Sequence, residues 1–348
     1  MEDADTKKRK VLNMLKMGIN LSLCLLFFLR RVLKRLLPEL WGCQRLRSKL
    51  GQSYTHGRDP YALVYKGKDP LVRYPVKIDK EKDLWLIDNF RNSRIKTRKG
   101  DTLANGDIAS KNALETRWTS ALIDINKVTS AKLFYLKDHQ RLGPTSTPLG
   151  HLQILFEFKR KGVLTPDGAY DRFVSSFDSF KQEGVKWTLL GGLLNSYDSG
   201  FVFGSYQDAL AKALTGFSGT ELHDFRLTQG QLKNFLRLTL EQGTDHERIS
   251  NHKYHASRNS CTTNQVQLLN EVLPKAQQIQ EWNLVMGHPL LRTWTSILPV
   301  FVIRELKRLT LLESNPFRRD GDQSIFSEYC DQLKTKSSVF HGLEPYFK

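Results

Sequence analysis

A cysteine at the start of a predicted helix is the feature that most constrains this chain. Residues 258–264 are small and polar, and residues 265–273 place apolar side chains at 266, 269, 272 and 273 on one helical face. This pattern predicts a helix that Pro274 ends, with Cys261 in its first turn. Unpaired backbone N–H groups and the positive end of the helix dipole favour a thiolate there. The pattern therefore indicates a nucleophile for covalent acyl chemistry, with a small buried cysteine as the alternative.

A histidine on a predicted strand supplies a partner for that thiol. Gly150 and His151 precede the apolar residues 152–158, which predicts a strand carrying His151 at its beginning. A strand-borne imidazole facing a thiol at a helix N-terminus is the arrangement of papain-like Cys–His enzymes. The order His before Cys is that of circularly permuted members of the class.

The residue that would orient His151 stays open among Gln153, Glu157 and Asp178. Glu157 is the poorest of the three because six residues of strand place it about 20 Å away.

Charge and composition limit the kind of partner. The chain has 53 basic and 36 acidic residues, a formal charge of +17, which favours nucleic acid or an acidic lipid surface. Because no zinc-finger, RNA-recognition or helix-turn-helix pattern is present, we expect no nucleic acid. His252 and His255 lack a third ligand, so we expect no metal, and nothing indicates a cofactor.

The N-terminal segment indicates a membrane. Basic residues at 7–10 and at 30–35 flank a mostly apolar stretch, 11–29. Its apolar core, 17–29, has 13 residues and is short for the ~20 residues of a membrane span, although residues 11–15 could extend it. An uncleaved anchor, a cleaved secretion signal and a surface-lying amphipathic helix are the alternatives. We favour the anchor because no cleavage site of small residues follows. The expected organisation is an anchor at 1–37, a basic linker at 38–80, a catalytic domain at 81–310 and an extension at 311–348.

Further elements of the domain follow from periodicity. Strands are expected at 131–136, 173–177, 185–190 and 222–227, and a helix after Thr228, with its buried face at 232, 235, 236, 239 and 240. The glycine-containing stretch 191–206 is interpreted as turns or as a place where the backbone approaches a ligand or acyl chain.

Five landmarks occur in order from residue 88 to about 306. They are Asn89-Phe90-Arg91 with Trp118; Gly150-His151 with its strand; residues 189–192 with Tyr206; residues 222–227 with the following helix; and Tyr254 with residues 259–264. In this order they resemble the Lnb family of bacterial lipoprotein N-acyltransferases. The chain departs from the family pattern at Ser260, where the family often has Asn, and in the order of charges at 223–226.

The resemblance implies an α+β fold: a permuted papain-like (NlpC-type) domain with an antiparallel sheet packed against helices, plus the N-terminal membrane-anchor helix. It also implies a thiol acyltransferase of the bacterial inner membrane with its catalytic domain in the periplasm. An acyl chain would pass from a phospholipid or glyceride ester, through a cysteine thioester, to the N-terminal amine of a lipoprotein.

The resemblance also implies roles for residues. Cys261 matches the nucleophile and His151 the base, with Asn259, Ser260 and Thr262 as neighbours of the oxyanion. The candidate substrate-binding residues are Arg91, Arg94, Gly191, Gly192, Tyr206 and Tyr254, and the two arginines are either solvated or in contact with a lipid phosphate. A thiol hydrolase on the same scaffold and a non-catalytic basic envelope protein remain the alternatives.

Overall fold

The structure is a computed structural model. It describes residues 62–63, 72–73, 75–95, 114–142, 147–180, 191–192, 197–245, 253–256, 259–279, 299–313 and 317–320. The predicted anchor at 1–37, most of the linker at 38–80 and the predicted strand at 185–190 lie outside these residues. Among the helices that are described, none combines the length and the apolar content needed to cross a bilayer.

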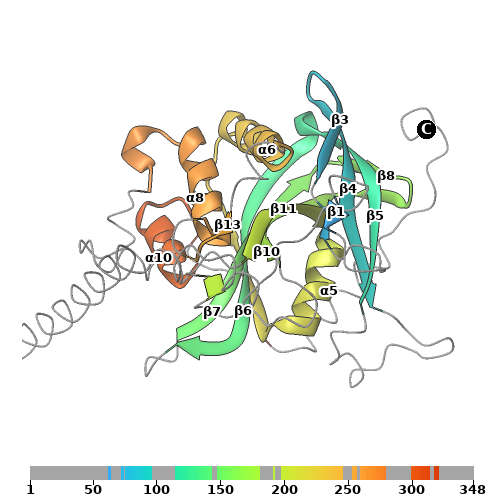
Figure 1. Cartoon of the computed structure of the whole chain (residues 1–348). Coiled ribbons are helices and arrows are strands. Elements are labelled where there is room, and N and C mark those ends of the chain that lie inside the picture. The colour runs from blue at the N-terminus through green and yellow to red at the C-terminus, as the bar shows by residue number, and fades with distance from the viewer. Residues whose placement is uncertain are drawn as a thin grey trace, which may run out of the picture.

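A large β-sheet forms the centre of the described chain (Figure 1). Its strands run in the order β14-β12-β6-β7-β10-β11-β4-β5-β8-β9, with β13 on β11 and β3 on β4. The strands are β3 (Val76–Glu81), β4 (Leu84–Ile95), β5 (Leu114–Asp124), β6 (Val128–Leu142), β7 (Thr147–Phe158), β8 (Val163–Thr165), β9 (Gly168–Tyr170), β10 (Arg172–Phe180), β11 (Tyr197–Ser205), β12 (Gly219–Asp224), β13 (Lys253–Tyr254) and β14 (Phe317–Asp320). A separate short pair joins β1 (Ala62–Leu63) to β2 (Val72–Arg73).

The sheet is mixed. Within the described residues its strand pairs are antiparallel except for β4 and β11, which meet in parallel at Arg91 and Gly204. The prediction of an antiparallel sheet is therefore correct for most strands and wrong for this one pair, because β11 enters the sheet beside β4 from a distant part of the chain.

Helices cover both faces of the sheet, which confirms the α+β class. The helices are α5 (Tyr206–Gly216), α6 (Gln229–Gly243), α8 (Cys261–Val272) and α10 (Pro299–Arg308), with short 3-10 turns η2 (Ile125–Lys127) and η3 (Lys275–Gln277). In Figure 1, α6, α8 and α10 gather on one side of the long strands and α5 lies on the other. Each side buries its own hydrophobic cluster.

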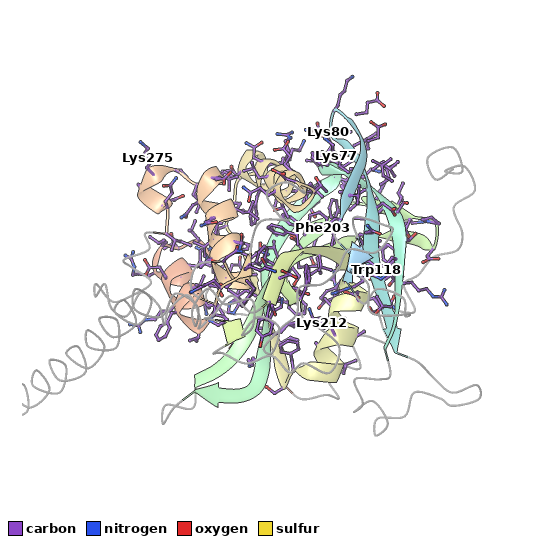
Figure 2. The ribbon with its side chains drawn as sticks, viewed as in Figure 1. Lys77, Lys80, Trp118, Phe203, Lys212 and Lys275 are labelled. Carbon is purple, nitrogen blue, oxygen red and sulfur yellow. The ribbon has the colours of Figure 1, made fainter. Side chains whose placement is uncertain are left out.

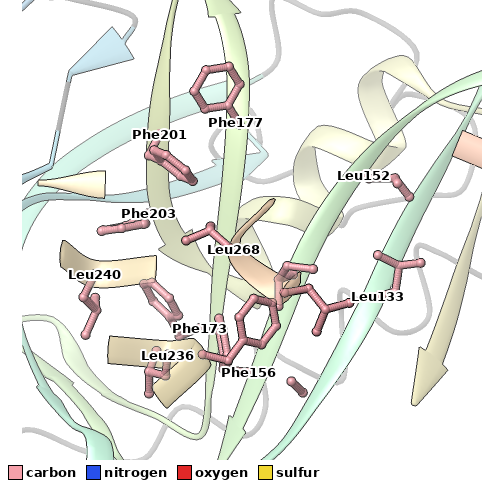
Figure 3. Packing of buried hydrophobic residues seen from close by; sticks show 14 of the residues in the cluster. Leu133, Leu152, Phe156, Phe173, Phe177, Phe201, Phe203, Leu236, Leu240 and Leu268 are labelled. Carbon is pink, nitrogen blue, oxygen red and sulfur yellow. The ribbon is translucent and has the colours of Figure 1, made fainter. Parts of the chain in front are cut away.

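Strand alternation divides residues of β7 between these two clusters. Leu152, Ile154 and Phe156 enter the larger cluster under α6, α8 and α10, whereas Leu155 enters the smaller cluster under α5. Figure 3 shows the larger cluster, in which aromatic side chains of β7, β10 and β11 meet leucines of α6 and α8. Each such side chain stabilises the fold by about 1.5–3 kcal/mol when fully buried, so β7 is held from both sides.

Several predicted boundaries differ from the structure. The strand at 150–158 begins at Thr147, so His151 lies inside it rather than at its start. The strand at 222–227 spans Gly219–Asp224. The stretch 197–205, interpreted as turns or a ligand approach, is the buried strand β11, because Phe201 and Phe203 fill the core. The helix after Thr228 is confirmed, with Thr228 as its cap.

Candidate active site

The sheet opens at the position of His151. The ladder between β7 and β10 ends at the pair Gln153–Ser176, whereas β7 continues along β6 and pairs His151 with Leu136. Helix α8 packs against both β7 and β10 at this end of their ladder. The backbone N–H of Leu152, just past the last β10 pair, donates to the sulfur of Cys261. The thiol therefore lies where two strands have separated.

The glycine before His151 has a steric cause. A Cβ atom at Gly150 would lie 2.2 Å from Cε2 of Tyr135 and 2.5 Å from the carbonyl oxygen of Leu136. Both distances are far inside van der Waals contact, and the second involves backbone, so a side chain here would displace β7 from β6. Gly150 is thus required to set the strand position from which His151 projects.

Cys261 is the first residue of α8, as the sequence predicts. Ser260 is the N-cap: its hydroxyl accepts from the N–H of Thr263, and the Thr263 hydroxyl accepts from the N–H of Ser260 at 2.8 Å. This capping box fixes the helix start, and therefore the position of the sulfur. Cys261 is only 5% exposed.

Asn259 holds the loop that leads into α8. Its amide donates to Oγ of Ser199 and to the carbonyl of Lys253, both at 3.1 Å, while its Oδ1 accepts from Asn264 at 2.9 Å. The Thr262 hydroxyl lies 3.8 Å from the sulfur of Cys261. The structure thus places Thr262 at the thiol, and Asn259 and Ser260 in the framework that positions it.

Asp178 on β10 contacts His151. Its Oδ1 lies 2.9 Å from Nε2 of His151, and the hydroxyl of Ser176 lies 2.7 Å from the same nitrogen. Gln153 donates to that hydroxyl at 3.2 Å. Glu157, at the other end of the ladder, pairs with Lys132 and Arg172. Of the three residues that the sequence leaves open, Asp178 is the one in direct contact with the imidazole.

The imidazole of His151 and the thiol of Cys261 each favour the charged form of the other. Burial alone would lower the pKa of His151, but the Cys261 thiolate and the Asp178 carboxylate outweigh burial and raise that pKa to about 9. Burial likewise would raise the pKa of Cys261. The His151 cation and the hydrogen bonds from His151, Leu152 and Thr262 more than offset burial, so the pKa of the thiol is lowered.

Two further titratable groups, Asp178 and Tyr254, interact electrostatically with His151 and Cys261. Burial would raise the pKa of Asp178, yet Lys212, His151 and Arg91 lower it well below its ordinary value. Burial, followed by the negative charges of Cys261 and Asp178, raises the pKa of Tyr254 well above its ordinary value. Because its pKa is raised, the phenol of Tyr254 stays protonated beside Cys261.

The remaining predicted substrate-binding residues lie at several places. Gly192 accepts from the N–H of Ala256, close in sequence to Tyr254, and Gly191 is buried beside Gly192. Tyr206 is the first residue of α5, and its buried ring packs on Phe134.

The two predicted arginines both lie on β4. Arg91 is buried, with its guanidinium on Asp208. The side chain of Arg94 lies outside the described residues. Substrate contact stays a prediction for all six candidates: Arg91, Arg94, Gly191, Gly192, Tyr206 and Tyr254.

Of the two histidines considered as metal ligands, the structure describes one. His255 forms a β-bridge with Asn259, while His252 lies outside the described residues. Within the part of the chain that the structure describes, no group of three or more His, Cys, Asp or Glu side chains is arranged to hold a metal ion.

Comparison with protein families gives a match over the body of this domain. The profile of the family described as the Lnb N-terminal periplasmic domain matches residues 115–308, just over half of the chain. The chain belongs to this family. The resemblance to the Lnb family is thereby confirmed, and the family description supports a periplasmic domain. Comparison with curated proteins and with solved structures found no significant match.

The matched region contains His151, Asp178, Tyr254 and Cys261, and therefore the whole Cys–His–Asp contact described above. The sequence did not single out Asp178 from Gln153 and Glu157, because the predicted strand ended at residue 177. A strand continued to residue 180 puts Ser176 and Asp178 on one face, since positions two apart share a face.

Proposed function

We propose that this protein is a thiol acyltransferase of the Lnb family, built on a circularly permuted papain-like scaffold. It would move an acyl chain from a phospholipid or glyceride ester to the N-terminal amine of a bacterial lipoprotein. The observation that carries the proposal is the contact of His151 with Cys261 on one side and with Asp178 on the other. Family membership supports the choice of substrates.

The first half-reaction forms a thioester. The Cys261 thiolate attacks the ester carbonyl carbon, and the ester C–O bond breaks as the C–S bond forms. His151, already protonated at neutral pH, gives its proton to the departing alkoxide, which leaves as a lyso-lipid alcohol. Asp178 stabilises the imidazolium and fixes its ring plane through Nε2.

Three donors around the sulfur suit the oxyanion of the tetrahedral intermediate. The N–H of Leu152, the hydroxyl of Thr262 and the phenol of Tyr254 all interact with the thiolate before attack. When the charge moves from sulfur to the carbonyl oxygen, donors next to the sulfur need little reorganisation to follow it. Removing one donor from such a set costs about 2.7–4 kcal/mol of barrier in comparable enzymes.

The second half-reaction releases the acyl chain as an amide. The lipoprotein amine attacks the thioester carbonyl, His151 takes a proton from the amine, and the C–S bond breaks to regenerate the thiolate. Because water would hydrolyse the same thioester, the site must exclude it, and the burial of Cys261 supports this requirement.

Residues 1–37 complete the proposal as an inner-membrane anchor with the catalytic domain on the periplasmic side. Such an anchor would keep the domain near both lipid substrates, and the excess of basic residues favours an anionic membrane surface.

A two-step assay with purified full-length protein tests the function. Phospholipid with a labelled acyl chain is added first, and a labelled, hydroxylamine-sensitive bond to Cys261 is expected by peptide mass spectrometry. A lipopeptide with a free N-terminal amine is added next, and labelled amide is expected. Cys261→Ser removes both products. Free fatty acid in place of amide would assign a thiol hydrolase, and no label at Cys261 would leave the non-catalytic alternative.

Cells provide the complementary measurement. Mass spectrometry of lipoprotein N-termini should show loss of the N-acyl group when this protein is absent, and its return with the wild-type chain but not with Cys261→Ser. Unchanged N-acylation in cells without the protein would rule out the proposed acceptor.

A further inference from the structure

An ionic cluster of two buried residues, Arg91 and Asp208, and the partly exposed Lys212 lies next to Asp178. Nε of Arg91 lies 3.1 and 2.9 Å from the two carboxylate oxygens of Asp208, and Nη2 lies 2.9 Å from Oδ2. Nη1 of the same guanidinium lies 3.9 Å from Oδ2 of Asp178. Lys212, one turn after Asp208 on α5, reaches that same oxygen at 2.8 Å. Figure 2 labels Lys212 on α5.

The two oxygens of Asp178 thus have separate partners. Oδ2 faces the cations Arg91 and Lys212, and Oδ1 faces His151 and the hydroxyl of Ser176. A carboxylate is planar, so fixing Oδ2 also fixes the direction of Oδ1. The cations decide where the second oxygen meets the imidazole.

A β-bulge turns Arg91 toward this cluster. Trp85 and Ile87 of β4 point into the larger hydrophobic cluster, and regular alternation would send residue 91 there too. The pairing of β4 with β5 shifts between Ile87 and Phe90, where Asn89 has a φ of 58°. Asparagine tolerates this left-handed conformation better than most residues. The extra residue gives the core position to Phe90 and turns Arg91 to the opposite face.

The surroundings of Asp208 hold it rigidly. Its Oδ1 also accepts from the N–H of Ser93, and its own N–H donates to Ser205, the N-cap of α5. A Cβ atom at Gly204 would lie 3.0 Å from the carbonyl of Arg91 and 3.1 Å from Oδ2 of Asp208. Three elements, β4, β11 and α5, therefore close around one ion pair.

We propose that Arg91 and Asp208, with Lys212, form a clamp that fixes the carboxylate of Asp178 on His151 and thereby sets how much of Cys261 is thiolate at neutral pH. Arg91 is on this account a positioning residue, separated from the sulfur by Asp178 and His151. The Asn89 bulge is the backbone feature that delivers it. The clamp rests on the proposed Cys–His–Asp site, and it accounts for the family landmark Asn89-Phe90-Arg91 without a substrate contact.

The decisive variant removes the pair without leaving a buried charge. Arg91→Met with Asp208→Asn deletes one charge of each sign and keeps an amide oxygen for the N–H of Ser93. Replacing both members of a buried ion pair often leaves stability unchanged, whereas removing one member leaves the other buried as an unpaired charge. Circular dichroism and thermal unfolding check that the double variant is folded.

The readout is the titration of Cys261, followed by the ultraviolet absorbance of the thiolate against a matched Cys261→Ser protein. In the double variant the thiolate should appear at higher pH than in the wild type, because only Lys212 then holds Oδ2 of Asp178. Added to Asp178→Asn, the same double change should have no further effect, since both act through one carboxylate. Arg91→Lys, which keeps the charge without the planar fork, should give an intermediate shift.

The matched control is Arg237→Met with Asp83→Asn, which removes an ion pair of 2.9 Å between α6 and the turn after β3. Its thiolate titration should equal that of the wild type. A folded Arg91→Met/Asp208→Asn protein with wild-type titration would overturn the clamp, as would loss of folding in both this variant and Arg91→Lys. Because the titration needs no acyl donor or acceptor, it stands apart from the outcome of the acyl-transfer assay.

Discussion

Two histidines of the sheet, the half-buried His151 on β7 and the buried His223 on β12, have similar neighbours and different surroundings. Nε2 of His151 lies 2.9 Å from a carboxylate oxygen of Asp178, and Nε2 of His223 lies 3.1 Å from one of Glu221. Each carboxylate also contacts a lysine, Lys212 for Asp178 and Lys137 for Glu221. A histidine, a carboxylate and a lysine therefore occur twice in this sheet.

The difference lies in the strand pairing. His223 is inside the ladder of β12 with β6, paired with Leu133, and only 1% exposed. Its Nδ1 is buried and lacks a hydrogen-bond partner within the described structure. His151 lies beyond the end of the β7–β10 ladder, where α8 brings in Cys261. A histidine beside a carboxylate becomes a candidate catalytic base only where the sheet leaves room for a nucleophile and a substrate.

Substitution of Cys261 or His151 should have the largest effect on acyl-enzyme formation, and it tests the difference between His151 and His223 most directly. Cys261→Ala is expected to abolish acyl-enzyme formation, and His151→Ala to reduce its rate about 10²–10⁴-fold, because proton transfer is lost. The rate is measured by trapping labelled acyl-enzyme. His223→Leu is the matched control and should keep the wild-type rate; an equal loss in that variant would remove the distinction between the two histidines.

Asp178→Asn should have the next largest effect, about 10²-fold on acyl-enzyme formation, since the imidazolium loses its carboxylate while the thiol remains. Its thiolate titration should move to higher pH. The corresponding change Glu221→Gln should leave that titration unaltered. A wild-type rate in Asp178→Asn would show that His151 needs no carboxylate.

The pH dependence of acyl transfer should also identify Cys261 and His151 as the active pair, with a smaller effect than the substitutions. Acyl transfer should rise as the pH passes the lowered pKa of Cys261 and fall as it passes about 9, where His151 loses its proton. The raised pKa of His151 also stabilises the fold, fully below pH ~6.5 and progressively less as the pH approaches 9. Rates and urea unfolding across this range measure both; a His151→Ala protein with the same alkaline loss of stability would contradict the assignment.

The smallest effect should come from His223→Leu itself. Its loss of the Glu221 hydrogen bond is offset by removal of a buried nitrogen without a partner, so the free energy of unfolding should change by about 1 kcal/mol or less. Chemical denaturation measures it. A loss of several kcal/mol would mean that the His223–Glu221 pair stabilises the sheet far more than an apolar side chain of similar size.

Much of the local structure follows from the sequence. The polar run before an apolar periodicity predicts the start of α8, and the capping box of Ser260 and Thr263 confirms it. Thr228 predicts the start of α6 for the same reason. These predictions succeed because caps and periodicity depend on residues within one or two turns. The strand that carries His151 and the one that carries Asp178 are also found, with errors at their ends.

The partners across the sheet could not be predicted in this way. The sequence does not choose among Gln153, Asp178 and the more distant Glu157 until the registers of β7 with β6 and β10 are known. A shift of one residue turns every side chain to the other face. The contacts of Arg91 depend on a bulge at Asn89, and a bulge leaves only a weak signal in sequence.

The sequence by itself determined the chemical groups and their local setting: a thiol capped at a helix start, an imidazole after a glycine on a strand, and a family pattern that joins them. Only the tertiary structure decided that Asp178 is the partner of His151 and that Arg91 faces inward to Asp208. The difference arises from how far apart along the chain the interacting residues lie. Caps and strand periodicity are set by neighbours along the chain, whereas strand register and ion pairing are set by how distant strands and helices pack together.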